Sequence, residues 1–374
     1  MPPHHLVVGT FNQNKLFTLA FDADAESLSV VKINEGQAPH SWLALNSRKD
    51  RLYATSWTTP PAIASYSISP SSPSSPPALT HLTSLPTAAR SGYVCVSDTH
   101  AYSAGGPTGE VFRIEEGTGK LVEEVQKLDF VGQEGRQKDD GSTMDFGGLR
   151  HGSHSFDLSP DGKLAYVADI GRNCIFVYSV DPSTGLLTLT DKNLAPRPTD
   201  GPRHVTPHPN GRYVYSLQEH SSMVDCFEVD REKGTLSWTG GVKIIPDDHD
   251  PKDYWADEVR VSPSQRYLYC STRHLTERSP TKKGWVAVYP LPPSGLLDPA
   301  SKPLALWETP TSGGWANAVE PAPGAYNKEG EEFVALTDSE EGLVLILGFD
   351  GERVREVART QLPDGAGAAT AVWL

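Results

Sequence analysis

The stretch HSFDLSPDGKLAYVAD at residues 154–169 decides the fold, because a second copy of its pattern follows as RHVTPHPNGRYVYS at residues 203–216. Each copy is an apolar segment, a turn with Pro and Gly, and a second segment rich in Tyr, Val, Leu or Ala. Proline presets φ at the first turn position, and glycine accepts a positive φ at the exit. The alternation after each turn has the period of a strand. Both stretches therefore predict a β-hairpin that repeats along the chain.

Weaker copies of this unit fill the rest of the sequence. Equivalent positions of the first strand are Trp42, Val94, Phe156, Val205, Val259, Val319 and Val372. They recur at steps of roughly 50 to 60 residues, a period typical of propeller blades. The seventh unit is split, with its inner strand at 369–374 and its next strands at 6–10 and 16–21. The sequence predicts an all-β, seven-bladed propeller over residues 1–374, a single domain closed by a blade that both termini share.

Composition and net charge limit the kinds of molecule that the protein is expected to bind. The formal net charge of −14 disfavours nucleic acid and anionic membranes, which require basic patches. No run of about 18 apolar residues occurs. Residues 1–9 contain no basic region followed by a long apolar region, so we do not expect a secretory signal. The four cysteines form no C-x-x-C pair, so we expect free thiols and a cytoplasmic protein. Helical stretches are scarce, and residues 253–258 are the best candidate for one or two turns.

Polar residues gather where the inner strands begin, and these strands line the channel of a propeller. The candidates there are His40, His151, His154, Arg203, His204, Glu258, Arg260, Trp315 and Asn317. Glu219 and Arg273 follow the second strands of their blades at comparable places. Arginine binds carboxylates bidentately, and a histidine or glutamate beside it can move a proton. Each residue also has a structural alternative, such as an ion pair or a hydrogen bond within its blade.

Other catalytic signatures are absent. The sequence contains no G-x-x-x-x-G-K-[ST], G-x-S-x-G or H-E-x-x-H motif, and it lacks the dipeptides of WD40 repeats. No pair of histidines or acids has a spacing that requires a metal.

The segment from GPRH at 201–204 through HPNGRYVY at 208–215 to Glu219 resembles the lactonase-type propeller family. That family includes bacterial 6-phosphogluconolactonases and fungal carboxy-cis,cis-muconate cyclases. SPDG at 159–162 with YVAD at 166–169 is similar to the preceding blade of the same family. Several segments resemble the fungal cyclase branch: HHL at 4–6 with GT at 9–10, SW at 41–42, TPTSGG at 309–314 with NAV at 317–319, and Asp338 with EG at 341–342.

The resemblance implies an intramolecular addition of a carboxylate to a diene acid, giving a γ-lactone without a cofactor or metal. It implies that His154, Arg203, Glu219 and Arg273 are catalytic, and we expect His154 to be the general acid, with Glu219 orienting it or sharing the role. His151, Trp315, Asn317 and His40 are the predicted substrate contacts. The expected partner is a small anionic molecule. A homo-oligomer is possible, and the sequence does not decide the oligomeric state.

One departure from the cyclase branch stands at Trp315-Ala316, where a polar His-Ser pair is expected. It replaces a polar contact by an aromatic wall and leaves the substrate open. Two alternatives also remain: a lactone hydrolase resembling 6-phosphogluconolactonase, and a non-enzymatic propeller that binds proteins.

Overall fold

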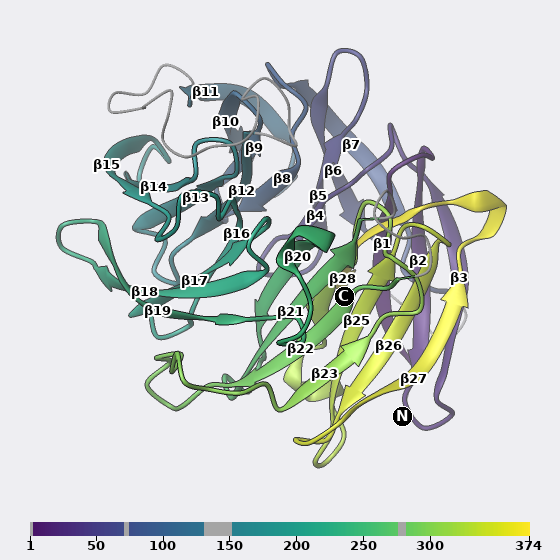
Figure 1. Cartoon of the computed structure of the whole chain (residues 1–374). Coiled ribbons are helices and arrows are strands. Elements are labelled where there is room, and N and C mark those ends of the chain that lie inside the picture. The colour runs from purple at the N-terminus through teal and green to yellow at the C-terminus, as the bar shows by residue number, and fades with distance from the viewer. Residues whose placement is uncertain (1–2, 71–74, 131–151, 276–281) are drawn as a thin grey trace.

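Seven four-stranded antiparallel sheets stand in a ring around a central axis, as the computed structural model of the chain shows (Figure 1). The structure describes residues 3–70, 75–130, 152–275 and 282–374. The innermost strands contact one another in the order β4, β8, β12, β16, β20, β24, β28 and back to β4. The predicted all-β, seven-bladed propeller is confirmed.

The strands of the blades, from the axis outward, have the following bounds. The first three blades are β4 (Leu43–Leu45), β5 (Arg51–Ser56), β6 (Ala62–Ile68), β7 (Leu79–Pro86); β8 (Tyr93–Val96), β9 (His100–Gly105), β10 (Thr108–Ile114), β11 (Leu121–Asp129); and β12 (Ser153–Leu158), β13 (Leu164–Asp169), β14 (Cys174–Val180), β15 (Leu187–Leu194). The next three are β16 (Pro202–Pro207), β17 (Tyr213–Gln218), β18 (Met223–Asp230), β19 (Thr235–Lys243); β20 (Tyr254–Val261), β21 (Tyr267–His274), β22 (Trp285–Pro290), β23 (Ala305–Glu308); and β24 (Val319–Pro321), β25 (Glu332–Asp338), β26 (Leu343–Phe349), β27 (Val354–Gln361).

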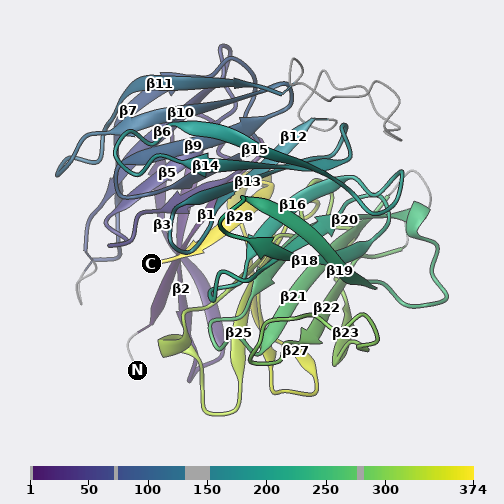
Figure 2. The same ribbon diagram turned by 90° about the vertical axis from the view of Figure 1, so that its left-hand side faces the viewer.

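The seventh blade is β28 (Ala368–Trp373), β1 (His4–Thr10), β2 (Lys15–Asp22) and β3 (Ser27–Glu35), so strands from both termini form one sheet. Leu6 lies opposite Trp373 and Val8 lies opposite Ala371 in the antiparallel register. Figure 2 shows β28 beside β1. The predicted closure by a shared blade is confirmed, and it leaves no open sheet edge between the last blade and the first.

The turns that suggested the repeat have the expected geometry. Gly162 and Gly211 have φ of 68° and 70°, the left-handed region that favours glycine. The amide of Gly162 donates to the carbonyl of Ser159 at 2.8 Å, and that of Gly211 donates to His208 at 2.8 Å. Each hydrogen bond closes the four-residue turn that aligns an inner strand with its neighbour.

Regular helix is limited, within the described ranges, to the short 3₁₀ turns η2 (Pro251–Asp253), η3 (Gly324–Tyr326) and η4 (Pro363–Gly365). The prediction of one or two helical turns at 253–258 was wrong, because β20 begins at Tyr254 and pairs with β21. No helix in the described part of the chain is long and apolar enough to cross a membrane.

Three consecutive inner strands carry a β-bulge at the same place. The register shifts between Ser153 and Ser155 in β12, between Pro202 and His204 in β16, and between Ala256 and Glu258 in β20. The extra residues are His154, Arg203 and Asp257. A bulge leaves its extra residue outside the ladder and re-aims its side chain. The repeat therefore delivers three polar side chains to one end of the channel.

Candidate active site

A cavity of about 840 Å³ opens at the end of the channel where the three bulges lie. His154, Arg203, Glu219, Asp257 and Arg273 all line it, although they come from three different blades. A volume in this range suits a small organic ligand. The four residues predicted to be catalytic therefore share one cavity. Their shared position does not by itself assign their roles.

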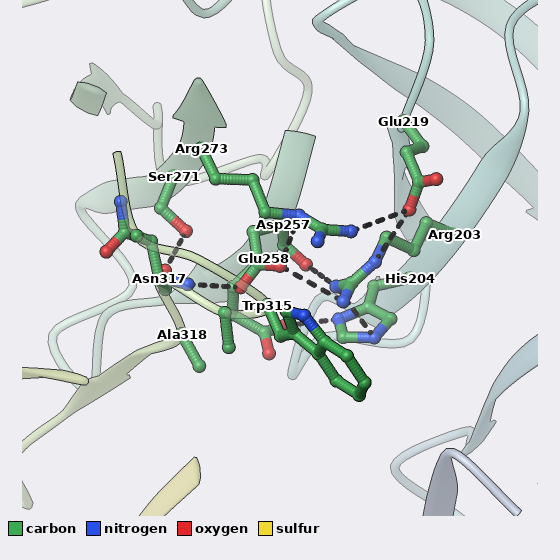
Figure 3. Close-up of polar contacts among 12 residues, drawn as sticks. Arg203, His204, Glu219, Asp257, Glu258, Ser271, Arg273, Trp315, Asn317 and Ala318 are labelled. Carbon is green, nitrogen blue, oxygen red and sulfur yellow. Dashed lines mark hydrogen bonds and ion pairs between the residues drawn. The ribbon is translucent and has the colours of Figure 1, made fainter. Parts of the chain in front are cut away.

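Arg203 is buried and held by two carboxylates. Its Nε lies 2.9 Å from Oε2 of Glu219, and its Nη2 lies 3.0 Å from Oδ1 of Asp257. Its Nη1 also donates to the main-chain carbonyl of Asp257. Figure 3 shows the guanidinium between these two acids. Contacts on three nitrogens fix the plane of the guanidinium, so its orientation is set before any ligand arrives.

Arg273 approaches the same two acids from β21. Its Nη2 lies 3.7 Å from Oε2 of Glu219, and its Nε lies 3.5 Å from Oδ1 of Asp257 (Figure 3). The guanidinium also stacks on the ring of Trp255, with 4.9 Å from Cζ to the centroid. Two cations and two anions thus form one compact group, and the acids keep the arginines close together despite their mutual repulsion.

His154 has a different neighbour from the one expected. Its Nδ1 lies 3.1 Å from Nε2 of His204, whose Nδ1 lies 2.9 Å from Oε1 of Glu258. The carboxylate of Glu219 pairs with the two arginines, and Glu258, through His204, is the acid linked to His154. Burial, followed by the charge of Arg203, holds the pKa of His154 well below its usual range. The same causes lower the pKa of His204. Both imidazoles are therefore neutral at pH 7 in the free protein.

Asp257 is a site residue that the predicted set did not include. Besides its contacts to both arginines, its Oδ2 accepts from the main-chain amide of Asn317 at 2.9 Å. A signal for it existed in the sequence. His154, Arg203 and Asp257 each stand two residues before the repeat anchors Phe156, Val205 and Val259.

Two of the predicted substrate contacts lie outside the cavity and need correction. His40 is fully buried, with Nδ1 2.6 Å from the carbonyl of Thr55 and Nε2 2.6 Å from the hydroxyl of Tyr66. Asn317 is also fully buried, and its side-chain amide donates to Thr272 at 3.1 Å. His40 bonds within its own blade and Asn317 bonds to the neighbouring blade at β21, so neither side chain lines the cavity. The predicted contact His151 lies outside the described residues.

Trp315 lines the cavity and is 62% exposed. Its ring lies 5.7 Å from Phe11 and 6.1 Å from Trp57, centroid to centroid. The loop before it turns through Gly313 and Gly314, with φ of 93° and 64°. Oγ of Ser339 accepts the amide of Trp315 at 2.6 Å. A firmly held loop thus presents an aromatic wall on the side of the cavity.

The described residues include no group of three or more His, Cys, Asp or Glu side chains placed to hold a metal ion.

Comparison with known proteins adds the family context. A family model described as "Lactonase, 7-bladed beta-propeller" matches residues 5–310. A Cutaneotrichosporon cutaneum protein named muconate cycloisomerase 1 is 43% identical, with 99% of this chain and 98% of that protein covered. A Neurospora crassa carboxy-cis,cis-muconate cyclase is 28% identical over the whole of both chains. A Pseudomonas aeruginosa periplasmic gluconolactonase structure superposes with a TM-score of 0.79 over 100% of this chain and 99% of that one, at 18% identity. That last likeness concerns the fold.

Proposed function

The chain belongs to the family of seven-bladed β-propeller lactonases, and from that premise we propose that it is a lactonising enzyme of the carboxy-cis,cis-muconate cyclase type. It is an intramolecular lyase that closes a cis,cis-muconate-type diene acid into a muconolactone. The observation that carries the proposal is the placement of Arg203 and Arg273 beside His154 in one cavity.

The reaction needs a carboxylate brought against an alkene. One carboxylate oxygen of the substrate attacks the γ carbon and forms the C–O bond of a five-membered lactone. The π electrons of the attacked double bond move to the carbon next to the other carboxylate, which becomes an enediolate. Arg203 and Arg273 bind the carboxylates in the reactive conformation and stabilise the charge that develops on the enediolate.

The enediolate carbon must then receive a proton. His154 is the general acid in this scheme, because it lines the cavity beside the arginines. Its pKa is lowered first by burial and then by charges that include those of Arg203 and Arg273. Substrate carboxylates offset those charges, so binding raises the pKa of His154 and allows it to take up a proton.

The charge balance of the cavity bears on which diene acid is bound. Glu219 and Asp257 already neutralise the two arginines, and Glu340 also lines the cavity. Trp315 adds an apolar wall where a further carboxylate would need a polar partner. These features favour a dicarboxylate, cis,cis-muconate itself, over the tricarboxylate 3-carboxy-cis,cis-muconate as the substrate.

The test is an ultraviolet assay with each of these two acids, since the absorbance of the conjugated diene falls when the ring closes. The product is identified by NMR. Gluconolactone and 6-phosphogluconolactone serve as counter-substrates for the hydrolytic alternative. Loss of diene absorbance with formation of a lactone supports the proposal. Opening of the sugar lactones with no turnover of either diene acid would overturn it.

The cysteines bear on where this enzyme works. Cys174, Cys226 and Cys270 are buried free thiols, and Cys95 is a free thiol that is partly buried. A chain that keeps all of its thiols free suits a reducing compartment, so we infer that it is cytoplasmic.

A further inference from the structure

We propose that His204 and Glu258 are positioning residues that hold His154 in one tautomer and keep its transferable proton on Nε2, an inference that rests on the function proposed above. Glu258, His204 and His154 form a continuous chain of polar contacts from β20 through β16 to β12. Only His154, at the end of the chain, lines the cavity.

Arg203 decides where the hydrogen of His204 lies. Its Nη1 is 3.3 Å from Nε2 of His204. A guanidinium can only donate, so Nε2 of His204 must accept. In the neutral imidazole the hydrogen is then on Nδ1, where Oε1 of Glu258 accepts it at 2.9 Å. The contact with Arg203 thus selects one of the two tautomers of His204.

The same reasoning passes to His154. Its Nδ1 lies 3.1 Å from Nε2 of His204, whose single lone pair is shared with Arg203. Two facing lone pairs would repel each other, so Nδ1 of His154 carries a hydrogen in both protonation states. The nitrogen left to bind or release a proton is Nε2. Since His154 lines the cavity, that is the nitrogen available to the substrate. The chain therefore aims a single proton at the reacting carbon.

Glu258 supplies the charge that stabilises a protonated His154 at its half-buried position. Its Oε1 also lies 3.0 Å from Nη1 of Arg260, and it accepts from the amide of Val259 at 3.1 Å. Burial raises the pKa of Glu258 to about 7, so the carboxylate ionises near neutrality. A negative charge one imidazole away stabilises the imidazolium of His154, as a carboxylate does behind a catalytic histidine.

The stoichiometry of the proposed reaction demands such an arrangement. Muconate is a dianion and muconolactone is a monoanion, so every turnover takes up one proton and delivers it to carbon. If the proton of His154 could reside on either ring nitrogen, some of the protein molecules would present the substrate with a nitrogen that carries no proton. Fixing the tautomer removes that loss.

Other charged groups surround the chain and act on the same titration. Arg203 of β16 and Arg273 of β21 lower the pKa of His154. Besides His204, the titratable groups around Glu258 are Arg260 and Asp257 of β20, Arg203 of β16, Asp157 of β12, Glu320 of β24, Tyr93 of β8 and Cys270 of β21. Tyr93 and Cys270 are neutral at pH 7, because burial raises the pKa of both. Among the groups around Glu258, Glu320 offers a matched control. Its Oε2 lies 3.1 Å from Nε of Arg260, and it has no contact with His204 among the described interactions.

The experiment compares Glu258→Gln with Glu320→Gln in the full-length protein, using cis,cis-muconate as the probe. We expect Glu258→Gln to lower kcat at pH 7 about tenfold or more, with KM little changed. Turnover requires a protonated His154, so kcat falls as pH rises through the pKa of that group in the complex. Loss of the buried negative charge lowers that pKa, and the alkaline limb of the kcat profile moves by about 1–2 pH units to lower pH. The limb of Glu320→Gln stays where it is in the parent protein.

A second comparison separates positioning from simple support of the fold. In a His154→Ala background, Glu258→Gln should cause no further loss of kcat, because its effect passes through His154. His204→Gln, which keeps a polar group near the position of Nε2, should repeat the shift of the limb if Glu258→Gln does not fold. The inference would be overturned if the alkaline limb of the kcat profile did not move in a folded Glu258→Gln or His204→Gln variant. It would also be overturned if Glu258→Gln lowered kcat as much in the His154→Ala background as in the parent protein. If the parent protein does not cyclise the diene acid at all, the proposed function fails instead.

Discussion

Oδ1 of Asp257 lies 3.0 Å from Nη2 of Arg203 in an ion pair, and the two residues occupy the same repeat position in neighbouring blades. Each is the extra residue of the bulge in its inner strand, and His154 is the extra residue one blade earlier. An irregularity repeated in three blades has thus produced a proton-transfer group, a cation and its counter-ion side by side. Propeller symmetry is what allows residues some fifty positions apart to become immediate neighbours.

Replacement of His154 by alanine should lower kcat for diene cyclisation by about 10²–10⁴-fold, with a much smaller change in KM. The reason is that the arginines still bind the carboxylates, while the enediolate loses its proton donor. Steady-state kinetics from the decline of diene absorbance measure both constants. Unimpaired turnover by a folded His154→Ala protein would show that another group donates the proton.

Arg273→Lys should lower kcat/KM by about 10–100-fold, although the charge is kept. A planar guanidinium reaches Glu219 and Asp257 and stacks on Trp255 at once, and an ammonium does not. Arg266→Lys is the matched control, since Arg266 belongs to the same blade but is exposed and pairs weakly with Glu332 at 3.7 Å. Kinetics at several ionic strengths complete the test. Equal activity of the two lysine variants would mean that Arg273 contributes charge alone.

Much of the architecture was accessible from sequence, because strand period and turn chemistry are local properties. Phe156 and Val205 anchor the blades as predicted, and each is fully buried. The shared seventh blade followed from the need to close a sheet edge. The shared cavity of His154, Arg203, Glu219 and Arg273 came from the resemblance, since the sequence alone gave a longer set of candidates.

The two predicted substrate contacts that do not line the cavity, His40 and Asn317, are displaced for physical reasons. His40 stands two residues before its anchor, as His154 does, but β4 starts only at Leu43, so His40 lies outside the strand and bonds within its own blade. Asn317 precedes β24 in the same way and supports Asp257 through its main chain. Whether a residue at this offset enters the channel depends on a bulge, which the side-chain pattern does not reveal.

Asp157→Asn should make the protein more stable at pH 8 than the parent, with a smaller advantage at pH 5. Burial raises the pKa of Asp157 to about 7, even though the charge of Arg260 acts in the opposite direction. A group with a raised folded-state pKa favours folding while it is protonated. That contribution is lost as pH rises from about 4, where the unfolded state ionises, to about 7. Above pH 7 the penalty is about 4 kcal/mol for the parent and absent for asparagine.

Thermal unfolding followed by circular dichroism across pH 4 to 8 checks this expectation. Asparagine keeps an acceptor for the hydroxyl of Tyr93, which donates to Oδ1 of Asp157 at 2.9 Å. Asp98→Asn, on an exposed turn, is the control and should leave the pH dependence unchanged. A stability difference between Asp157→Asn and the parent that does not grow with pH would contradict the prediction.

Trp315 and Ala316 should decide how strongly the enzyme prefers a dicarboxylate. Trp315 is largely exposed to the cavity, and a tricarboxylate placed against its ring would desolvate a charge without a polar partner. The double change Trp315→His with Ala316→Ser supplies polar groups at that wall. The ratio of kcat/KM for 3-carboxy-cis,cis-muconate to that for cis,cis-muconate should rise by about tenfold or more, since a site that hydrogen-bonds a substrate group discriminates strongly for it.

The change leaves in place the main-chain hydrogen bonds that hold this loop. Oγ of Ser339 accepts the main-chain amides of both residues, at 2.6 Å for Trp315 and 3.2 Å for Ala316. Trp238→His is the matched control, since Trp238 is 53% exposed on β19 and does not line the cavity. It should leave the ratio unchanged. An unaltered ratio in the double variant would show that the arginine pair and its counter-ions, rather than the aromatic wall, set the number of carboxylates that the site accepts.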